Sequence, residues 1–153
     1  MAQTTGGMSA NAMYVGLSTD NSSWTDVSGY ANSVVPGGGE RKTGEAFTFD
    51  GDTPIIKAGK RGALEFTISG VYTEETNKFY AMAKAAYEAG SSLYARWSPG
   101  GGDSGDYGYT TSAGIVVNQP YPSGSSDNGD PILIEVTLRF ATLTQSTIGT
   151  AGW

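Results

Sequence analysis

The chain has 153 residues, a net charge of −6 and 23 glycines, and it contains neither cysteine nor histidine. One domain is expected from this length, and the composition excludes disulfides and thiolate chemistry and removes the commonest general base and zinc ligand. Few basic residues are clustered, so we expect no tight binding to nucleic acid. No stretch approaches the roughly 18 apolar residues of a membrane span, so we expect no membrane insertion.

The N-terminal third combines mobile segments with short strands. Residues 1–12 are small and polar, which predicts a flexible N-terminal arm. Alternating apolar residues predict a first strand at 13–18, and residues 24–27 are expected to form a second. Residues 35–44 join three consecutive glycines to charged side chains, which predicts a long flexible loop. The N-terminus lacks a secretory signal pattern, so we expect the protein to stay in the cytoplasm where it is made.

The middle of the chain switches from the period of a strand to that of a helix. Residues 63–72 alternate apolar and polar side chains, as a half-buried strand does. Residues 74–89 carry apolar side chains at helical spacing, which predicts the one convincing helix. Thr73 is expected to cap its start, and Gly90 is expected to end it in the left-handed conformation.

The C-terminal half returns to strands. Further strands are predicted at 93–97, 107–111, 115–117 and 132–141. A polar loop is expected at 120–131, and residues 144–153 are expected to form a polar tail after a body of residues 13–143. The chain is therefore predicted to be mainly β, an antiparallel β-sandwich or barrel with one flanking α-helix.

Several possible sites have a simpler explanation. Residues 37–43 resemble a phosphate-binding loop but lack the required glycine and the helix that should follow. Three acidic pairs suit turns better than calcium sites. These pairs are Asp50 with Asp52, Asp103 with Asp106, and Asp127 with Asp130. We expect no metal and no cofactor.

Two rival functions rest on particular side chains. The carboxylates of Glu65, Glu135, Asp103 and Asp106 could in principle perform glycoside hydrolysis, although a solvated strand face explains them better. A set of aromatic residues could form a sugar-binding platform, or fill the core or a subunit interface. This set is Tyr94, Trp97, Tyr107, Tyr109 and Tyr121.

An ordered series of motifs goes beyond general β character. It comprises SWTDVSG at 23–29, GEAFTFDGDTPI at 44–55, GVYTE at 70–74, AAYEAG at 85–90, LYARWSPGG at 93–101, GDY at 105–107, YTT at 109–111, YP at 121–122 and DPILIEVTL at 130–138. In this order the motifs resemble the major tail tube proteins of long, non-contractile-tailed bacteriophages. The resemblance covers roughly residues 13 to 143.

The resemblance implies a non-enzymatic structural protein of the virion. Six copies would close into a ring, their inner strands would join into a continuous β-barrel, and stacked rings would form the tail tube through which DNA is ejected. Its partners would be further copies, a tape measure protein, and tail tip and terminator proteins. DNA would pass through the lumen without specific binding, and the protein would lie in the virion tail after assembly in the host cytoplasm.

Two groups of residues are expected to serve this assembly. The polar faces of the two best strands could line the lumen or, equally, face outer solvent, and they carry Glu65, Thr67, Ser69, Glu135 and Thr137. Contacts between rings or subunits are expected from Gly37, Gly38, Gly39, Glu40, Arg41, Lys42 and Trp153. The alternatives are a tube protein of a contractile tail or secretion system and a carbohydrate-binding β-sandwich.

Overall fold

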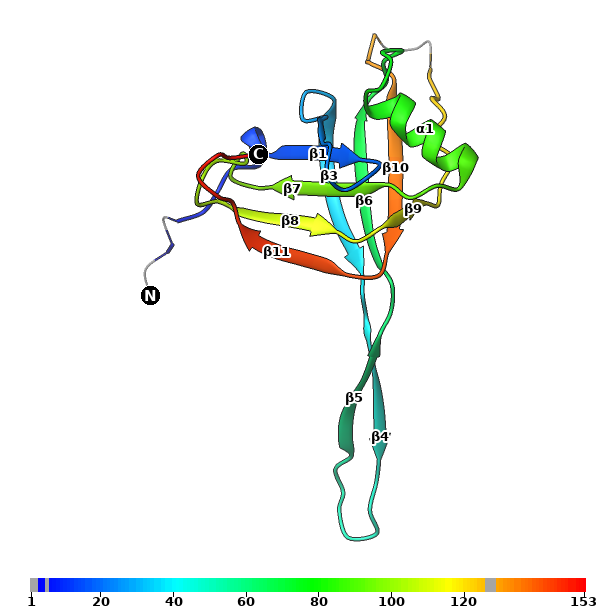
Figure 1. The fold of residues 1–153 in the computed structure, drawn as a ribbon. Coiled ribbons are helices and arrows are strands. Elements are labelled where there is room, and N and C mark those ends of the chain that lie inside the picture. Colours follow the sequence, from blue (N-terminus) through cyan, green and yellow to red (C-terminus); the bar gives the residue numbers. More distant parts are fainter. Residues whose placement is uncertain (1–2, 5, 126–128) are drawn as a thin grey trace.

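The computed structural model describes residues 3–4, 6–125 and 129–153, and its elements build two packed sheets with one helix beside them (Figure 1). In chain order the elements are η1 (Ala10–Ala12), β1 (Tyr14–Ser18), β2 (Thr25–Asp26), β3 (Ala31–Gly38), β4 (Arg41–Ala46), β5 (Ile55–Arg61), β6 (Leu64–Val71), α1 (Phe79–Ala89), β7 (Tyr94–Ser98), β8 (Tyr107–Thr111), β9 (Gly114–Val116), β10 (Leu133–Phe140) and β11 (Leu143–Thr147).

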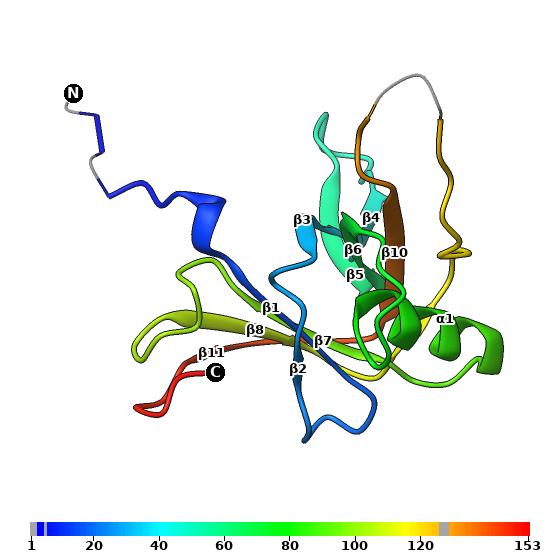
Figure 2. The same ribbon diagram turned by 90° about the horizontal axis from the view of Figure 1, so that it is seen from above.

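The strands form three antiparallel groups. One sheet has five strands in the order β11-β8-β7-β1-β2, and the other has four in the order β3-β6-β10-β9. The strands of the five-stranded sheet run across those of the four-stranded sheet (Figure 2). The third group, β4 and β5, projects away from both sheets (Figure 1). The predicted antiparallel β-sandwich with one flanking helix is therefore confirmed.

The core lies between the two sheets. Phe66 and Ile68 of β6 and Val136 and Leu138 of β10 are fully buried, as alternation along each strand predicts. Trp97 of β7 stacks on Phe66 with ring centroids 4.1 Å apart, which joins the two sheets through their largest side chains.

Helix α1 ends where the sequence predicts but begins five residues later than predicted. Gly90 has φ 62° and its N–H donates to the carbonyls of Ala86 and Tyr87, which confirms the expected left-handed end. The expected cap at Thr73 is wrong: the residue before the helix is Lys78, and Asn77 has φ 57°. A left-handed residue cannot lie inside a right-handed helix, so α1 cannot begin before Asn77.

The segment 35–44 is predicted to be a loop, but in the structure it is part of a long hairpin. β3 pairs with β6 and β4 pairs with β5, so the chain from Ala31 to Val71 runs out to a turn at 47–54 and returns. The outer strands of this hairpin are exposed along their whole length. A strand without a buried face has no need to alternate apolar and polar residues, which is why the pattern resembled a loop.

The predicted tail is also partly ordered. Residues 143–147 form β11, which pairs with β8 at the edge of the five-stranded sheet. Of the predicted loop at 120–131, residues 126–128 lie outside the described residues, and the others form neither helix nor strand. Of the N-terminal arm, residues 1, 2 and 5 lie outside the described residues. No helix in the described part of the chain is long and apolar enough to span a bilayer.

Candidate assembly surfaces

All five residues expected to line a lumen lie on the outward face of the four-stranded sheet, here called the polar face. The register of β6 and β10 places Thr67 opposite Thr137 and Ser69 opposite Glu135. The two threonine hydroxyl oxygens are 3.1 Å apart and share a hydrogen bond. Next to them, the Arg139 Nε lies 3.9 Å from the Glu65 carboxylate. Two strands 70 residues apart in sequence thus build one continuous hydrophilic surface.

The edge strands of this sheet carry apolar side chains on the same outward face. Val35 on β3 lies opposite Thr67 and is 57% exposed, and Ile115 on β9 lies opposite Arg139 and is 53% exposed. Val117, just beyond β9, is similarly exposed. The face is therefore polar in the centre and apolar at both flanks, a pattern typical of a surface whose margins are covered by neighbours.

Asn118 protects one edge of the sheet with its side chain. Its Nδ2 donates to the Glu135 carbonyl at 2.9 Å, and its Oδ1 accepts from the Thr137 N–H at 2.7 Å. These two bonds imitate the backbone pairing of a strand at the point where the three-residue β9 has ended. Backbone groups on the exposed edge of β10 thereby have hydrogen-bond partners although β9 does not extend along them.

Six of the seven predicted contact residues lie at the neck of the projecting hairpin. Gly37 and Gly38 end β3, and Arg41 and Lys42 begin β4. Gly38 and Gly39 both have positive φ, and a Cβ on Gly38 would lie 2.6 Å from the Ala63 carbonyl oxygen. Glycine is therefore required where the hairpin leaves the sheet.

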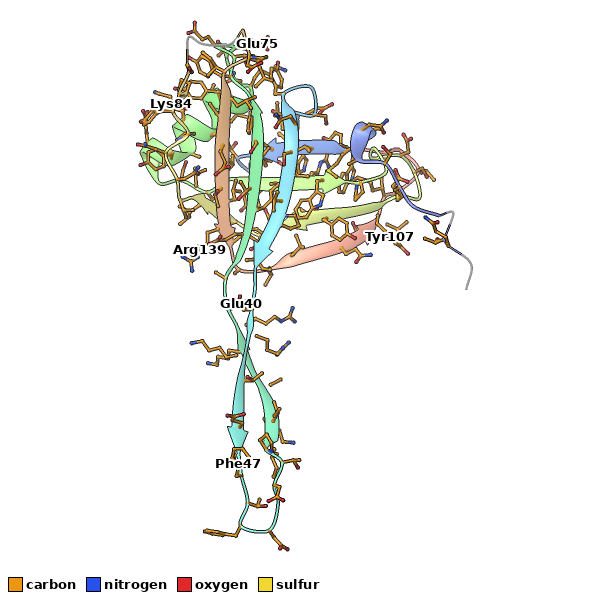
Figure 3. All side chains as sticks on the ribbon, turned by 180° about the vertical axis from the view of Figure 1, so that it is seen from behind. Glu40, Phe47, Glu75, Lys84, Tyr107 and Arg139 are labelled. Carbon is orange, nitrogen blue, oxygen red and sulfur yellow. The ribbon has the colours of Figure 1, made fainter. Side chains whose placement is uncertain are left out.

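The outer part of the hairpin has an exposed apolar tip that is not predicted from the sequence. Figure 3 shows Phe47 far from the packed sheets, beyond Glu40 at the neck. Four apolar side chains are exposed there, namely Phe47, Phe49, Ile55 and Ile56. In the sequence these residues form two apolar pairs on either side of a turn, a pattern that does not distinguish an exposed contact surface from a short buried strand.

Trp153, the seventh predicted contact residue, packs on its own chain. The guanidinium of Arg96 lies 4.6 Å from the ring centroids of Trp153 and Trp24 and 5.2 Å from that of Tyr14. The Arg96 side chain also donates to the Tyr14 hydroxyl at 3.0 Å. The ring of Trp153 further covers Gly108, where a Cβ would lie 2.2 Å from it. This residue fastens the C-terminal segment to the five-stranded sheet.

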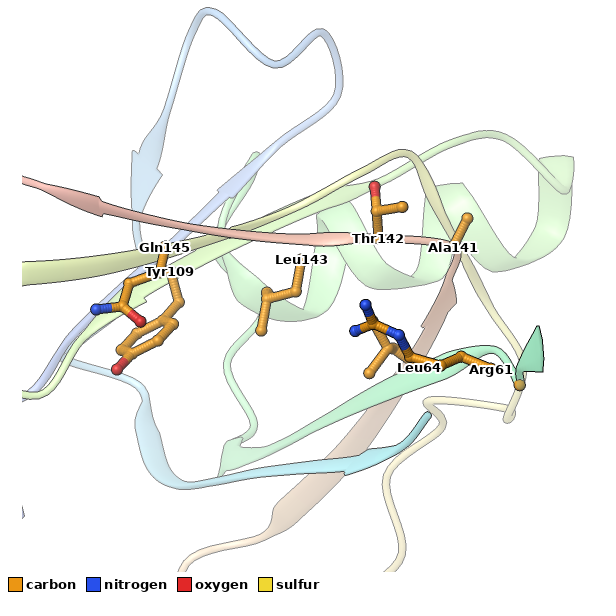
Figure 4. A pocket seen from close by; sticks show the side chains of 8 residues that line it. Arg61, Leu64, Tyr109, Ala141, Thr142, Leu143 and Gln145 are labelled. Carbon is orange, nitrogen blue, oxygen red and sulfur yellow. The ribbon is translucent and has the colours of Figure 1, made fainter. Parts of the chain in front are cut away.

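A cavity of about 550 Å³ opens between the neck of the hairpin and the edge strand β11 (Figure 4). Its lining residues are Arg61, Gly62, Leu64, Tyr109, Ala141, Thr142, Leu143 and Gln145. None of them is a carboxylate, so the cavity has no acidic residue for general acid–base chemistry.

The arrangement argues against glycoside hydrolysis by the pair Glu65 and Glu135. Glu65 lies opposite Arg139, and Glu135 is four residues away from Arg139 along β10. Four residues of strand span roughly 13 Å, beyond the roughly 5–10 Å that a catalytic carboxylate pair requires. Among the described residues, no group of three or more acidic side chains is placed to hold a metal ion.

The aromatic set is dispersed and does not form a platform. Trp97 is buried and stacks between Phe66 and Tyr109. Tyr107 is exposed at the start of β8, whereas Tyr121 packs edge-on against Tyr87 and donates a hydrogen bond to Glu88 on the helix. A flat sugar-binding surface would require these rings to lie side by side.

No protein-family model and no curated protein matches the sequence. The fold, however, matches a chain of the sheath–tube complex of the extracellular contractile injection system PVC in its extended state, with a TM-score of 0.71, 12% identity and 94% of each chain covered. A chain of the tail of an empty gene transfer agent particle, computed with C6 symmetry, matches with a TM-score of 0.65 and 12% identity over 92% of this chain and 98% of that one.

The SPP1 tail tube matches with a TM-score of 0.61 and 11% identity, over 92% of this chain and 80% of that chain. The described chain therefore has the tail-tube fold.

Proposed function

We propose that this chain, which has the tail-tube fold, is a structural virion protein that assembles into stacked six-membered rings and forms the wall of a phage tail tube. Such a tube would conduct DNA into the host cell. The observation that carries the proposal is the four-stranded sheet, whose outward face is polar in the centre and apolar at both edges.

The edges support closure into a ring. On its outer side β3 pairs with no other described strand, and on the other side β9 is only three residues long. Pairing these edges between copies would remove both and close a barrel, the usual solution for exposed strands. Val35 of one copy would then meet Ile115 and Val117 of the next. A head-to-tail contact of this kind closes into a ring when the rotation from one copy to the next is a whole fraction of a full turn.

The polar face suits the inside of such a barrel. Glu65 and Glu135 are opposed by one cation, Arg139, so each copy would present net negative charge to the lumen. A surface that repels phosphates offers no counterion release, so DNA would slide past it without being held. The tube would lie in the virion tail after assembly in the host cytoplasm. It would end at tip and terminator proteins and would enclose a tape measure protein before DNA enters.

Electron microscopy of the purified protein at high concentration tests the polymer, because tubes of stacked rings are expected.

Labelling then tests the direction of the polar face. In assembled tubes, cysteines introduced as Thr67→Cys and Thr137→Cys should react with a small maleimide but be protected from one carrying a bulky polymer. The matched control is Ala85→Cys on the exposed side of α1, which should react with both reagents.

Two outcomes would contradict the proposal. If the protein stayed monomeric at all concentrations, no tube would form and the proposed function would be wrong. If position 67 in tubes reacted with the bulky reagent as readily as position 85, the polar face would lie on the outside of the tube.

A tube of a contractile system is the second candidate, since the PVC sheath–tube complex shares the fold. Tubes that bind a sheath-type protein along their outer surface would favour it over a non-contractile tail.

A further inference from the structure

The outer edge of β9 is partly occupied by its own chain. On the inner side of β9, the Val117 N–H donates to the Thr137 carbonyl of β10. Backbone groups alternate between the two sides of a strand, so those of Gly114 and Val116 point away from β10. The Leu93 N–H donates to the Gly114 carbonyl at 2.8 Å, and the Gly114 N–H donates to the Leu93 carbonyl at 2.9 Å. The edge is therefore open only from Val116 onward.

The strand geometry of β9 does not continue past Val117. Asn118 turns its side-chain amide toward β10, where it bonds to Glu135 and Thr137. The amide takes the place of the next backbone group, so the ladder ends there. Within the part of the chain that the structure describes, Val116 is thus the one residue of β9 whose N–H and C=O both face the open edge unpaired. Unpaired backbone groups of this kind require a partner, and Val116 is only 4% exposed.

The free edge of β3 is interrupted by a proline. The Gly39 N–H donates to the chain entering β6, so odd-numbered residues of β3 face β6 and even-numbered ones face the open side. Of the latter, Pro36 has no N–H, and Gly38 has φ 68°, outside the strand region. The register is irregular between residues 31 and 33. Val34 is therefore the residue of the regular part of β3 that offers both a donor and an acceptor.

We propose that Val34 of one copy pairs with Val116 of the next and that this pair fixes the register within each ring. This inference rests on the proposed tube and names the joint between its neighbours. Rotation about the tube axis preserves strand direction, and β3 runs opposite to β9 in the sheet, so the joint is antiparallel. The pair places Val35 opposite Ile115 on the polar face, where the two exposed apolar side chains cover each other.

The neighbouring registers are less favourable. Pro36 and Val116 lie at one level across the sheet, both in line with Phe66. Pairing Pro36 with Val116 would leave the Val116 carbonyl without a donor and would join the copies without stagger, whereas closure into a barrel requires a stagger. A shift in the other direction would place Val34 opposite Gly114, whose backbone groups are already bound. The proposed pair gives a stagger of two residues from one copy to the next.

Cysteines introduced one at a time test the register, since the chain has none of its own. Val35→Cys and Ile115→Cys are purified separately, mixed, assembled and oxidised. Directly opposed residues of a non-hydrogen-bonded pair have Cα atoms about 4.5 Å apart, within the range of a disulfide. A linked dimer of about twice 15.9 kDa is expected in the mixture, and neither variant alone should give it. Thermal unfolding of each variant verifies that it folds.

The matched control replaces Ile115→Cys by Val117→Cys, which lies on the same face and is similarly exposed. In the proposed register this position is diagonal to position 35, with side chains about 7–8 Å apart, so at least about tenfold less dimer is expected. Dimer that favours position 117 would overturn the register, and tubes without dimer from either mixture would overturn the strand joint, while both leave the tube intact. Failure of the unmodified protein to form tubes would remove the proposed function and this inference together.

A proline at the pairing residue gives an independent readout. Val34→Pro removes an N–H that faces the open edge and not β6, so the subunit should keep a cooperative thermal transition. The assembled fraction should fall about tenfold, because every joint in the ring loses a hydrogen bond. Val34→Ala keeps the N–H and should assemble. An equal loss in both variants would show that the side chain, and not the backbone pair, makes the joint, and it would overturn the proposal.

Discussion

The sandwich and the hairpin are built on opposite principles. In the sandwich, Phe66, Val136 and Leu138 are completely removed from water, and Trp97 joins the two sheets. In the hairpin, β4 and β5 bury nothing, and the largest side chains point into solvent at the tip. The first region contains its own hydrophobic driving force, whereas the second offers apolar surface that only another molecule can cover.

Under the proposed function, this difference would separate folding from assembly within one chain. Changes in the sandwich should alter the stability of each subunit, and changes in the hairpin should alter polymerisation at constant stability. Each of the following experiments would break or sharpen that division.

Removing the hairpin should have the largest effect on assembly. Replacing residues 40–62 by Asn-Gly joins β3 to β6 through a two-residue turn that suits a tight hairpin. We expect tubes to be abolished in electron micrographs while the subunit retains a cooperative thermal transition, because the replaced strands contribute no side chain to the core. Loss of that transition would show that the hairpin supports the sandwich.

A pair of phenylalanine substitutions compares the two regions directly. Phe66→Ala should lower the free energy of unfolding by about 3–5 kcal/mol, as deletion of a fully buried aromatic ring does. Phe49→Ala should change it by less than about 0.5 kcal/mol, because this side chain is fully exposed. Chemical denaturation measures both values. Sedimentation should show reduced assembly for Phe49→Ala alone, once conditions are chosen in which the Phe66 variant is folded.

A loss of stability smaller than that of Phe66→Ala is expected at Trp153. Trp153→Ala removes one ring from the group around Arg96, and we expect a loss of about 1–2 kcal/mol in the free energy of unfolding from the lost cation–π contact and packing. Denaturation of the free subunit would reveal it. If Trp153 instead contacted other copies, as the sequence suggested, assembly would fall while the stability of the subunit stayed unchanged.

The parts of the fold predicted from sequence are those with a buried face. Apolar and polar residues alternate along β6 and β10 because one side of each strand meets the core. In α1, apolar residues recur at helical spacing because Phe79, Ala83 and Ala86 pack inward. The hairpin strands and β11 have little or no such face, so their residues resembled a loop and a tail. Only backbone pairing with a neighbouring strand orders these strands, and such pairing is scarcely visible in their amino-acid composition.

The candidate surfaces follow the same rule. The polar face was predicted because its residues alternate with core residues, and register then brought Thr67 and Thr137 together. The apolar flanks were not predicted. Val35 falls in the segment predicted to be a loop, and Ile115 lies on the three-residue β9, where one exposed apolar side chain looks like a buried one in sequence. Asn118 gave no signal, because its role depends on backbone atoms of β10 that lie 17 and 19 residues away.

The two left-handed glycines at the neck limit which substitutions the hairpin tolerates. Positions 38 and 39 admit almost no other residue, because a side chain would collide with Ala63 or Leu64. Beyond them the strands β4 and β5 are exposed, so most of their side chains can vary without disturbing the sandwich. Substitutions in the hairpin could therefore change what it would contact in the proposed assembly while leaving the direction in which it projects unchanged.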